Sequence, residues 1–401
     1  MFKIIKNTIW QGLGKMVVVM AGLVTTSLLI RNLGESQYGL FSLIGSSFLV
    51  IDALADMGTK MIGVREISKS KNRQKTFKNL FFLRFILILV GLGLGLIFVF
   101  SYPTFKGYEK EAMMALVMCF LTFLAGNLEV IFQANEQMGK KSTIDSLFPL
   151  VFLGLYLLTP IKTTILVVFG LYVIARILSL LVGVKMIGRV DWELMDFKVD
   201  IELVKKLFWS SLPMGLFLFL FTVYDRAIDN IIIDRYLGIN EVAWYSLAYK
   251  VYGNLVMPAY FLVTSAFPSF SREAKENGKS TYKKIMVISV GLSLVIWPIV
   301  WLGAPLAMKI LSGNEFNWQV STQVLRILSL GLVFNFINHV KGFYLISRDG
   351  EKKMLILGVI SLVFNLGANL VFVPIYGVIG AAWVTMATEV LMTMTYLLFC
   401  K

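Results

Sequence analysis

The sequence is poor in the residues from which soluble enzymes build cross-linked or metal-bound sites. It has two cysteines, Cys119 and Cys400, which lie far apart in or beside apolar stretches, so neither a disulfide framework nor a cysteine metal site is predicted. His339 is the one histidine, which excludes a multi-histidine metal site. A Gly-rich nucleotide-binding loop ending in Lys is absent from the sequence. These absences argue against a metalloenzyme and against export driven by ATP.

Apolar residues are what the chain has in excess. They form 57% of its 401 residues against 15% charged residues, and the mean hydropathy is +0.77. The apolar residues recur in stretches of about twenty, the length of helix that crosses a bilayer core about 30 Å thick. The pattern therefore predicts an all-α integral membrane protein with about twelve transmembrane helices and little chain for a soluble domain.

The predicted spans can be placed to within a few residues. They cover residues 10–33, 39–63, 80–102, 113–133, 145–160, 164–184, 208–234, 243–268, 285–308, 323–346, 354–375 and 377–400. The fifth ends at Pro160, and the eleventh and twelfth are separated by a tight turn around Gly377. Prolines at 213, 258 and 298 fall within spans seven, eight and nine, where each permits a kink.

Basic residues alternate between dense and bare intervals along the chain. Residues 65–78 and 272–284 are rich in Lys and Arg, whereas the intervals assigned to the outside are nearly bare. Because short basic loops stay on the cytoplasmic side, both termini are predicted to be cytoplasmic in a multi-pass protein of the cell (inner) membrane. This topology and anionic lipid headgroups explain the net charge of +14, so no nucleic-acid partner is predicted.

The two halves of the sequence share a repeated segment. Residues 33–43 align with residues 237–247, and Arg31 then falls on Arg235. The Leu-Gly pair that begins each copy predicts a helix end, since Gly adopts the left-handed cap. An even number of spans in each half gives parallel repeats about an axis along the membrane normal.

The repeat predicts the division of the chain. An N-terminal six-helix lobe is expected over residues 1–190 and a C-terminal six-helix lobe over residues 207–401. The mixed-charge segment 191–206 is expected to be a cytoplasmic amphipathic connector. Two parallel lobes leave a central cavity between them.

Several stretches resemble one family. Residues 33–43 look like its turn between the first two helices, residues 224–229 with Leu237 and Gly238 like its seventh and eighth, and residues 325–328 and 365–381 like its tenth to twelfth. By these stretches the chain resembles, over essentially its whole length, the Wzx-like polysaccharide (O-antigen) flippases of the multidrug/oligosaccharidyl-lipid/polysaccharide exporter (MOP, MATE-like) superfamily.

The resemblance implies a transporter and not an enzyme. Such a flippase moves a polyprenyl-pyrophosphate-linked oligosaccharide from the cytoplasmic to the outer leaflet by alternating access, for cell-surface polysaccharide biosynthesis. It implies a lipid-linked glycan as cargo, glycosyltransferases and a polysaccharide polymerase as partners, and no cofactor apart from H⁺ or Na⁺ coupling.

Ionisable residues inside the spans are candidates for function, since each costs about 2.5–3.5 kcal/mol at the centre of a bilayer on insertion scales. Basic groups suited to a pyrophosphate in the cavity are Arg176, Arg226, Lys250 and Arg326. Acids that could gate the cavity or couple it to ions are Asp52, Asp56, Asp225, Asp229 and Glu389. By their spacing, Asp52, Asp56 and Lys60 should share one helix face, as should Asp225 and Asp229. The alternative is that these acids and bases pair with one another.

Other charged residues are expected near span ends, where long side chains reach the interface. They are Lys15, Lys60, Arg84, Glu129, Asp145, Asp234 and Lys341. For His339 a packing role is favoured over a proton relay.

Three other functions compete with the flippase. A cation-coupled MATE-type drug exporter would carry an acid deep in its first helix, where this chain offers only Lys15. A peptidoglycan lipid-precursor flippase is similar but typically has two further helices. A membrane polysaccharide polymerase or glycosyltransferase would need a larger outer loop with an acidic cluster.

Overall fold

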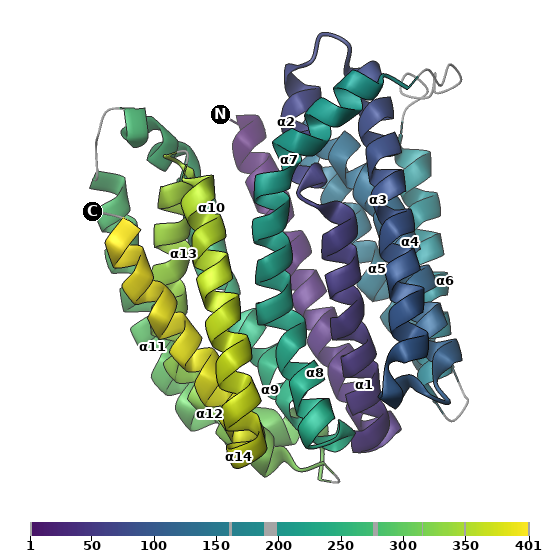
Figure 1. Cartoon of the computed structure of the whole chain (residues 1–401), viewed down its shortest axis with the longest axis vertical. Helices are drawn as coiled ribbons and strands as arrows, with labels where there is room; N and C mark the ends of the chain where they lie inside the picture. The colour runs from purple at the N-terminus through teal and green to yellow at the C-terminus, as the bar shows by residue number, and fades with distance from the viewer. Residues whose placement is uncertain are drawn as a thin grey trace. The chain divides into compact units, whose positions relative to one another are not determined.

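The computed structural model describes residues 2–159, 163–187, 199–275, 280–314, 316–348 and 350–399. Within these ranges the chain is helical, with short turns and no β-strand (Figure 1). The first half contains α1 (Phe2–Asp56), α2 (Thr59–Lys69), α3 (Arg73–Ser101), the 3₁₀ helix η1 (Pro103–Phe105), α4 (Glu109–Ala134), α5 (Met138–Leu158) and α6 (Ile165–Met186). The second half contains α7 (Ile201–Thr222), the π-helical segment η3 (Val223–Ala227), α8 (Ile228–Tyr236), α9 (Ile239–Leu255), α10 (Met257–Lys275), α11 (Ser280–Ser312), α12 (Trp318–Leu330), α13 (Leu332–Ile346) and α14 (Glu351–Phe399).

The helices reproduce the predicted spans. In the described part of the chain, eight helices are long and apolar enough to cross a membrane, or nine if α12 and α13, bent by 45°, form one span. Two of these, Gly14–Lys69 and Lys352–Leu398, are 56 and 47 residues long, and each contains two predicted spans. The predicted eighth span is covered by α9 and α10, which are 17 and 19 residues long.

Glycines make the turns inside the two long helices. Gly34 in α1 has φ 74° and Gly377 in α14 has φ 62°, and both interrupt the helical backbone. Gly238, the repeat partner of Gly34, has φ 119° and precedes α9. A side chain at a positive φ is strained, which explains glycine at each position. The helix ends predicted at the two Leu-Gly pairs are therefore confirmed.

The prolines at which kinks are predicted do not all coincide with breaks in the helices. Helix α7 runs without interruption through Pro213, and α11 does so through Pro298. Pro258 lies in the first turn of α10, just after a break at Val256. The interruptions inside predicted spans fall at Met57–Gly58, Val223–Ala227, Val256 and Gly331. Proline fits within a membrane helix because neighbouring groups can satisfy the freed carbonyl, so proline alone does not locate a break.

The chain folds into two compact units. The first unit comprises residues 1–28 and 44–219, and the second comprises residues 29–43 and 220–401. The turn between the first two spans thus belongs to the second unit, and α7 is divided near its end. Residues 191–198 of the predicted connector 191–206 lie outside the described residues, and its second half leads into α7, so the predicted lobe boundaries remain a prediction.

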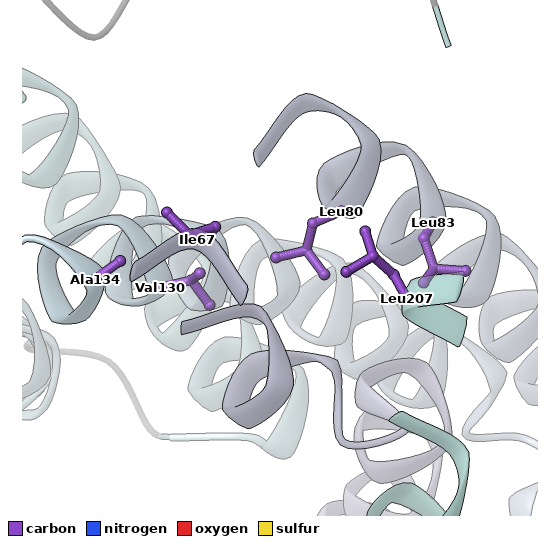
Figure 2. Packing of buried hydrophobic residues seen from close by; sticks show 6 residues of the cluster. All are labelled: Ile67, Leu80, Leu83, Val130, Ala134 and Leu207. Atoms are coloured by element: carbon purple, nitrogen blue, oxygen red, sulfur yellow. The ribbon is translucent and has the colours of Figure 1, made fainter. Parts of the chain in front are cut away.

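Apolar packing in the first unit joins α7 to α2, α3 and α4. Figure 2 shows this cluster of buried side chains. It consists of Ile67 from α2, Leu80 and Leu83 from α3, Val130 and Ala134 from α4, and Leu207 from α7. Leu203, Val204 and Phe208 extend it along α7. Burying these side chains, at about 25 cal/mol per Å² of apolar surface, fixes the first half of α7 in this unit.

Exposed apolar side chains cover the long helices. Ile97 and Phe100 of α3 are largely exposed, as are Val287 and Leu302 of α11. In water such faces would drive aggregation, whereas in a bilayer they contact lipid tails. The exposure fits the predicted membrane location of these helices.

A polar contact anchors the start of α7. The Asp200 carboxylate accepts the Leu203 N–H at 3.0 Å and lies 2.7 Å from Lys75 Nζ of α3. The Asp200 N–H donates to Asn79 Oδ1 at 2.8 Å. The hydrogen bond from Lys75 and then the Leu203 N–H lower the pKa of Asp200 below its ordinary value of 3.8.

Asp200→Asn is expected to remove a pH-dependent contribution to stability. Because the folded pKa is lowered, the carboxylate stabilises the fold above about pH 4, and this contribution is lost as the pH falls through the lowered pKa. The melting temperature in detergent, measured from pH 6 to pH 2.5, should therefore fall less steeply for Asp200→Asn than for the wild type. Glu202→Gln, on the same helix turn, is the control. Parallel curves for wild type and Asp200→Asn would contradict the assignment.

Candidate substrate and coupling sites

Asp229, at the start of α8, lies in a buried polar cluster of the second unit. It is 5% exposed. It accepts hydrogen bonds from Tyr245 Oη of α9, from Asn369 Nδ2 at 2.7 Å and from Thr385 Oγ1 at 3.0 Å. The last two residues come from the two arms of α14, on either side of the Gly377 turn. Helices that are distant in sequence thus converge on one carboxylate.

Asp225 lies one turn before Asp229, in the π-helical segment. The Ile228 N–H bonds the Val223 carbonyl, five residues back, which widens the helix there. Tyr249 Oη donates to Asp225 Oδ1 at 2.6 Å. The two tyrosines stack on α9 with ring centroids 5.7 Å apart, so both aspartates face the same side of that helix. The shared face predicted for Asp225 and Asp229 is confirmed.

Glu389 of α14 occupies a second buried cluster in the same unit. It is 7% exposed. Asn335 Nδ2 donates to one carboxylate oxygen at 2.9 Å, and Asn338 Nδ2 donates to the other at 2.8 Å. Both asparagines lie on α13. His339, the next residue along that helix, contacts the Asn335 carbonyl at 3.0 Å, which fits the predicted packing role.

These two carboxylates differ from most buried acids in having no cationic partner. Among the described residues, neither Asp229 nor Glu389 forms an ion pair. A buried charge without a counter-charge is costly, so such a group takes up a proton or a cation. Their surroundings are hydroxyls and amides, and the amides donate from nitrogen to the carboxylates. Hydroxyl, amide and carboxylate oxygens are the ligand type that hard cations take. Within the described residues, the predicted pairing with Arg or Lys is therefore not found for these two acids, and the side chain of Arg226, one of the predicted partners, is not among those residues.

In the first unit, Asp56 does have a cationic partner. Arg84 Nη1 lies 2.8 Å from Asp56 Oδ1 and donates to Thr59 Oγ1 at 2.9 Å. Arg84 Nε donates to Asn127 Oδ1 at 2.8 Å, and the guanidinium lies over the Phe123 ring. This arginine is 1% exposed. Asp56 thus has a structural partner in the described chain, but this partner is Arg84 and not one of the four bases of the pairing alternative.

Two predictions about charged residues are corrected here. Arg84 and Lys341, expected near span ends where they would reach the interface, are 1% and 6% exposed because neighbouring helices cover them. Arg84 pairs with Asp56, and Lys341 donates from Nζ to the Thr393 carbonyl at 3.4 Å.

The shared face of Asp56 and Lys60 stays a prediction. The regular helix that would give their spacing is interrupted, while Lys60 and Arg84, the partner of Asp56, both lie beside Gly126. The backbone leaves the helix between Asp56 and Lys60, at Met57 with φ 41° and Gly58 with φ 72°.

Close backbone packing explains the break between Asp56 and Lys60. A Cβ at Gly58 would lie 2.8 Å from the Gly215 nitrogen of α7. A Cβ at Gly215 would in turn clash with the Met57 carbonyl. The interruption in the second span is therefore built around two glycines of the first unit, which bring two helix backbones together.

The basic cargo candidates lie in both units. Arg176 of α6 packs its guanidinium 3.9 Å from the Phe148 ring centre, with Asp52, Glu129 and Asp145 as its electrostatic neighbours. Its Nε is buried and has no hydrogen-bond partner in the described part of the protein.

The other three candidates belong to the second unit. Arg326 of α12 donates from Nε to the Trp301 carbonyl at 3.1 Å and lies over that indole. Lys250 of α9 is exposed. The side chain of Arg226 lies outside the described part.

Sequence reasoning missed the uncharged members of these clusters. They are Asn335, Asn338, Asn365, Asn369, Thr385 and Thr388, all in otherwise apolar helices. Asn365 accepts from Asn369 Nδ2 at 3.0 Å and donates to Thr388 Oγ1 at 3.3 Å, which extends the Asp229 cluster toward Glu389. Asparagine inside a transmembrane span is a signal that a search restricted to charged residues overlooks.

The fold is shared with solved membrane transporters. An inward-facing multidrug resistance MATE family transporter of the MOP superfamily matches with a TM-score of 0.82 and 16% identity, covering 95% of this chain and 93% of the other. The lipid II flippase MurJ matches with a TM-score of 0.81 and 14% identity, and the match covers 98% of this chain and 87% of the MurJ chain. These matches and the helix pattern define an all-α, multi-pass membrane protein with the MOP-type fold.

Sequence comparison gives the family. The model described as "Polysaccharide biosynthesis protein" matches residues 4–274, and the MatE model matches residues 213–371. This chain belongs to the polysaccharide biosynthesis protein family.

Two curated relatives extend the comparison. The "Putative O-antigen transporter" of Shigella flexneri is 23% identical over 400 residues, 94% of this chain and 93% of its own length. The "Probable low-salt glycan biosynthesis flippase Agl15" of Haloferax volcanii is 22% identical over 369 residues, which make up 88% of this chain and 74% of the relative's length.

Proposed function

We propose that this protein is a flippase that moves a polyprenyl-pyrophosphate-linked oligosaccharide from the cytoplasmic to the outer leaflet. The family and the names of two relatives that cover most of the chain support a glycan cargo. The observation in the site that carries the proposal is Arg176, a half-buried cation whose Nε lacks an acceptor among the described residues. A guanidinium in this state suits a phosphate oxygen that arrives with the cargo.

Lys250, Arg326 and Arg226 are proposed to contact the cargo as well. Lys250 is exposed. Arg326 uses Nε for its hydrogen bond to the Trp301 carbonyl, so its two terminal guanidinium nitrogens can donate to a phosphate. A pyrophosphate offers several acceptor oxygens, so it can engage more than one such group as it moves.

The acids are proposed to couple transport to an ion gradient. Asp229 and Glu389 are buried carboxylates without a cationic partner among the described residues, and a proton or Na⁺ would neutralise them. Asp225 adjoins Asp229 through the stacked tyrosines, so it belongs to the same site. Asp52, beside Arg176, is proposed to gate the cargo site. Asp56 is proposed to stabilise the helix interruption at Met57 and Gly58 through its ion pair with Arg84.

The remaining parts of the proposal follow from the family and the basic loops. The protein is placed in the cell (cytoplasmic) membrane with both termini inside, since basic residues favour that side. Glycosyltransferases that build the glycan and a polymerase that consumes it are its proposed partners. It has no enzymatic step of its own.

A cation-coupled drug exporter is the second candidate function. The MatE match over residues 213–371 and the unbalanced acids of the second unit favour it. An exporter of cations would need its acids, whereas a pyrophosphate flippase needs both its acids and its basic groups.

Charge reversal of the basic groups tests the flippase. Arg176→Glu, Lys250→Glu and Arg326→Glu are each expected to slow translocation at least about tenfold, the equivalent of about 1.4 kcal/mol in the transition state. Each replaces attraction for phosphate by repulsion. The measurement is the flipping of a fluorescent polyprenyl-pyrophosphate N-acetylglucosamine in proteoliposomes.

Lys106→Glu, in the exposed loop before α4, is the control for a change in charge alone. Detergent extraction and size-exclusion profiles should be unchanged in all four variants. Normal flipping by all three span variants would remove these residues from the cargo site. Uptake of a cationic dye that survives their charge reversal, with no flipping by the wild type, would favour the drug exporter.

A further inference from the structure

The turn between the first two spans is attached to the second unit by a charged side chain at the end of α11. Arg31 donates from Nη2 to the Ile310 carbonyl, in the last turn of that helix. Its side chain also lies against Gly313, which follows the helix with φ 80°. The last carbonyls of a helix lack intrahelical donors and carry partial negative charge. Arg31 therefore supplies both a donor and a charge of the complementary sign.

An acidic side chain makes the opposite contact four residues later. Glu35 accepts a hydrogen bond from the backbone N–H of Asn317. Asn317 is the residue before α12, where free N–H groups carry partial positive charge. The turn thus places a cation on the end of α11 and an anion on the start of α12.

Backbone packing on α9 adds to these two contacts. A Cβ on Gly39 would clash with the carbonyl of Ile239, the first residue of α9. Tyr38, Leu40 and Leu43 are buried as well. The turn therefore fits closely into the second unit, although it is continuous in sequence with the first unit on both sides, at residues 28 and 44.

The second copy of the repeat lacks this arrangement. Arg235, which aligns with Arg31, is exposed, and no hydrogen bond or ion pair is found for it in the described part of the chain. Ile239 occupies the position of Glu35 and cannot accept a hydrogen bond through its side chain. A Leu-Gly turn does not require such contacts for its own folding, so the pair at 31 and 35 serves the attachment.

We propose that residues 29–43 form a detachable latch, held on the ends of α11 and α12 by Arg31 and Glu35, and that its release is an obligatory step of transport. This rests on the proposed function, because the released state belongs to a transport cycle. The Arg31 contact is exposed and the Glu35 contact is partly buried, and charge–dipole contacts that water can reach suit a latch, since water replaces them when they break.

Reversible crosslinking tests whether release is obligatory. Glu35→Cys with Asn317→Cys, in a Cys119→Ser and Cys400→Ser background, should lose at least about tenfold in flipping of the fluorescent polyprenyl-pyrophosphate probe on oxidation and regain it on reduction. Glu273→Cys with Thr281→Cys crosslinks neighbouring helices of the same unit and should leave flipping unchanged. Equal flipping by the oxidised and reduced latch pair would overturn the proposal.

A measurement without cargo separates the latch from the proposed function. Spin labels at Gln37 and Gln319, both on exposed positions, should show a short and a long distance population in liposomes. Arg31→Glu with Glu35→Lys should move the balance at least about threefold toward the long distance, because both charges then face like-signed helix ends. Arg235→Glu should leave the balance of the two distances unchanged. One short distance, unchanged by the double variant, would overturn the latch even if the protein flips its cargo.

Discussion

Asp229→Asn is expected to make transport independent of proton and sodium gradients and to slow it at least about tenfold. The amide keeps the size of the carboxylate but carries no charge to be neutralised. It also presents an N–H₂ group toward Tyr245, Thr385 and Asn369, so one of the three donors loses its acceptor. Flipping in proteoliposomes, with imposed pH or Na⁺ gradients of either sign, measures the effect.

Asp234→Asn, on the same helix, is the matched control and should keep the ion response of the wild type. Size-exclusion profiles of both variants would separate misfolding from lost coupling. An ion response that persists in Asp229→Asn would assign the coupling elsewhere, and Glu389→Gln would then be the variant to lose it.

Arg84→Met is expected to destabilise the protein by about 3–5 kcal/mol, the cost of removing one partner of a buried ion pair. The substitution leaves Asp56 without its cation and Asn127 without a donor from Arg84. The apolar Met retains much of the packing on Phe123. Equilibrium unfolding in mixed detergent micelles measures the loss.

The double variant Arg84→Met with Asp56→Asn should be more stable than Arg84→Met alone, because no unpaired charge remains. Arg65→Met, in an exposed pair with Glu66, should change stability by less than about 0.5 kcal/mol. An Arg84→Met protein as stable as the wild type would show that the buried pair contributes nothing.

The two carboxylate clusters and the Arg84 pair show two solutions to the same problem. Arg84 and Asp56 neutralise each other inside the first unit, and two neutral residues complete their hydrogen bonds. Asp229 and Glu389 have hydrogen bonds but no counter-charge in the described chain. The first arrangement stabilises a fixed structure, whereas the second leaves a charge that a mobile ion can balance, which is why the coupling proposal rests on these two residues.

Part of the site could be predicted from local sequence. Asp225 and Asp229 face one side because they are one turn apart, and their partners Tyr245 and Tyr249 have the same spacing on the next helix. Asp56 and Lys60 have that spacing too, yet the helix is broken between them. The break depends on Gly215 of α7, far away in sequence, and no local pattern contains that contact.

The sequence by itself determined the membrane class, the helical spans, the glycine turns and the family. Each of these depends on hydropathy over about twenty residues or on the backbone freedom of a single Gly, and both are local properties. Only the tertiary structure decided which charges are paired, that Arg84 is buried, and that the turn at residues 29–43 packs with the second unit. Those outcomes depend on which distant side chains meet in a low-dielectric interior, where one contact decides whether a charge is stabilised or left unbalanced.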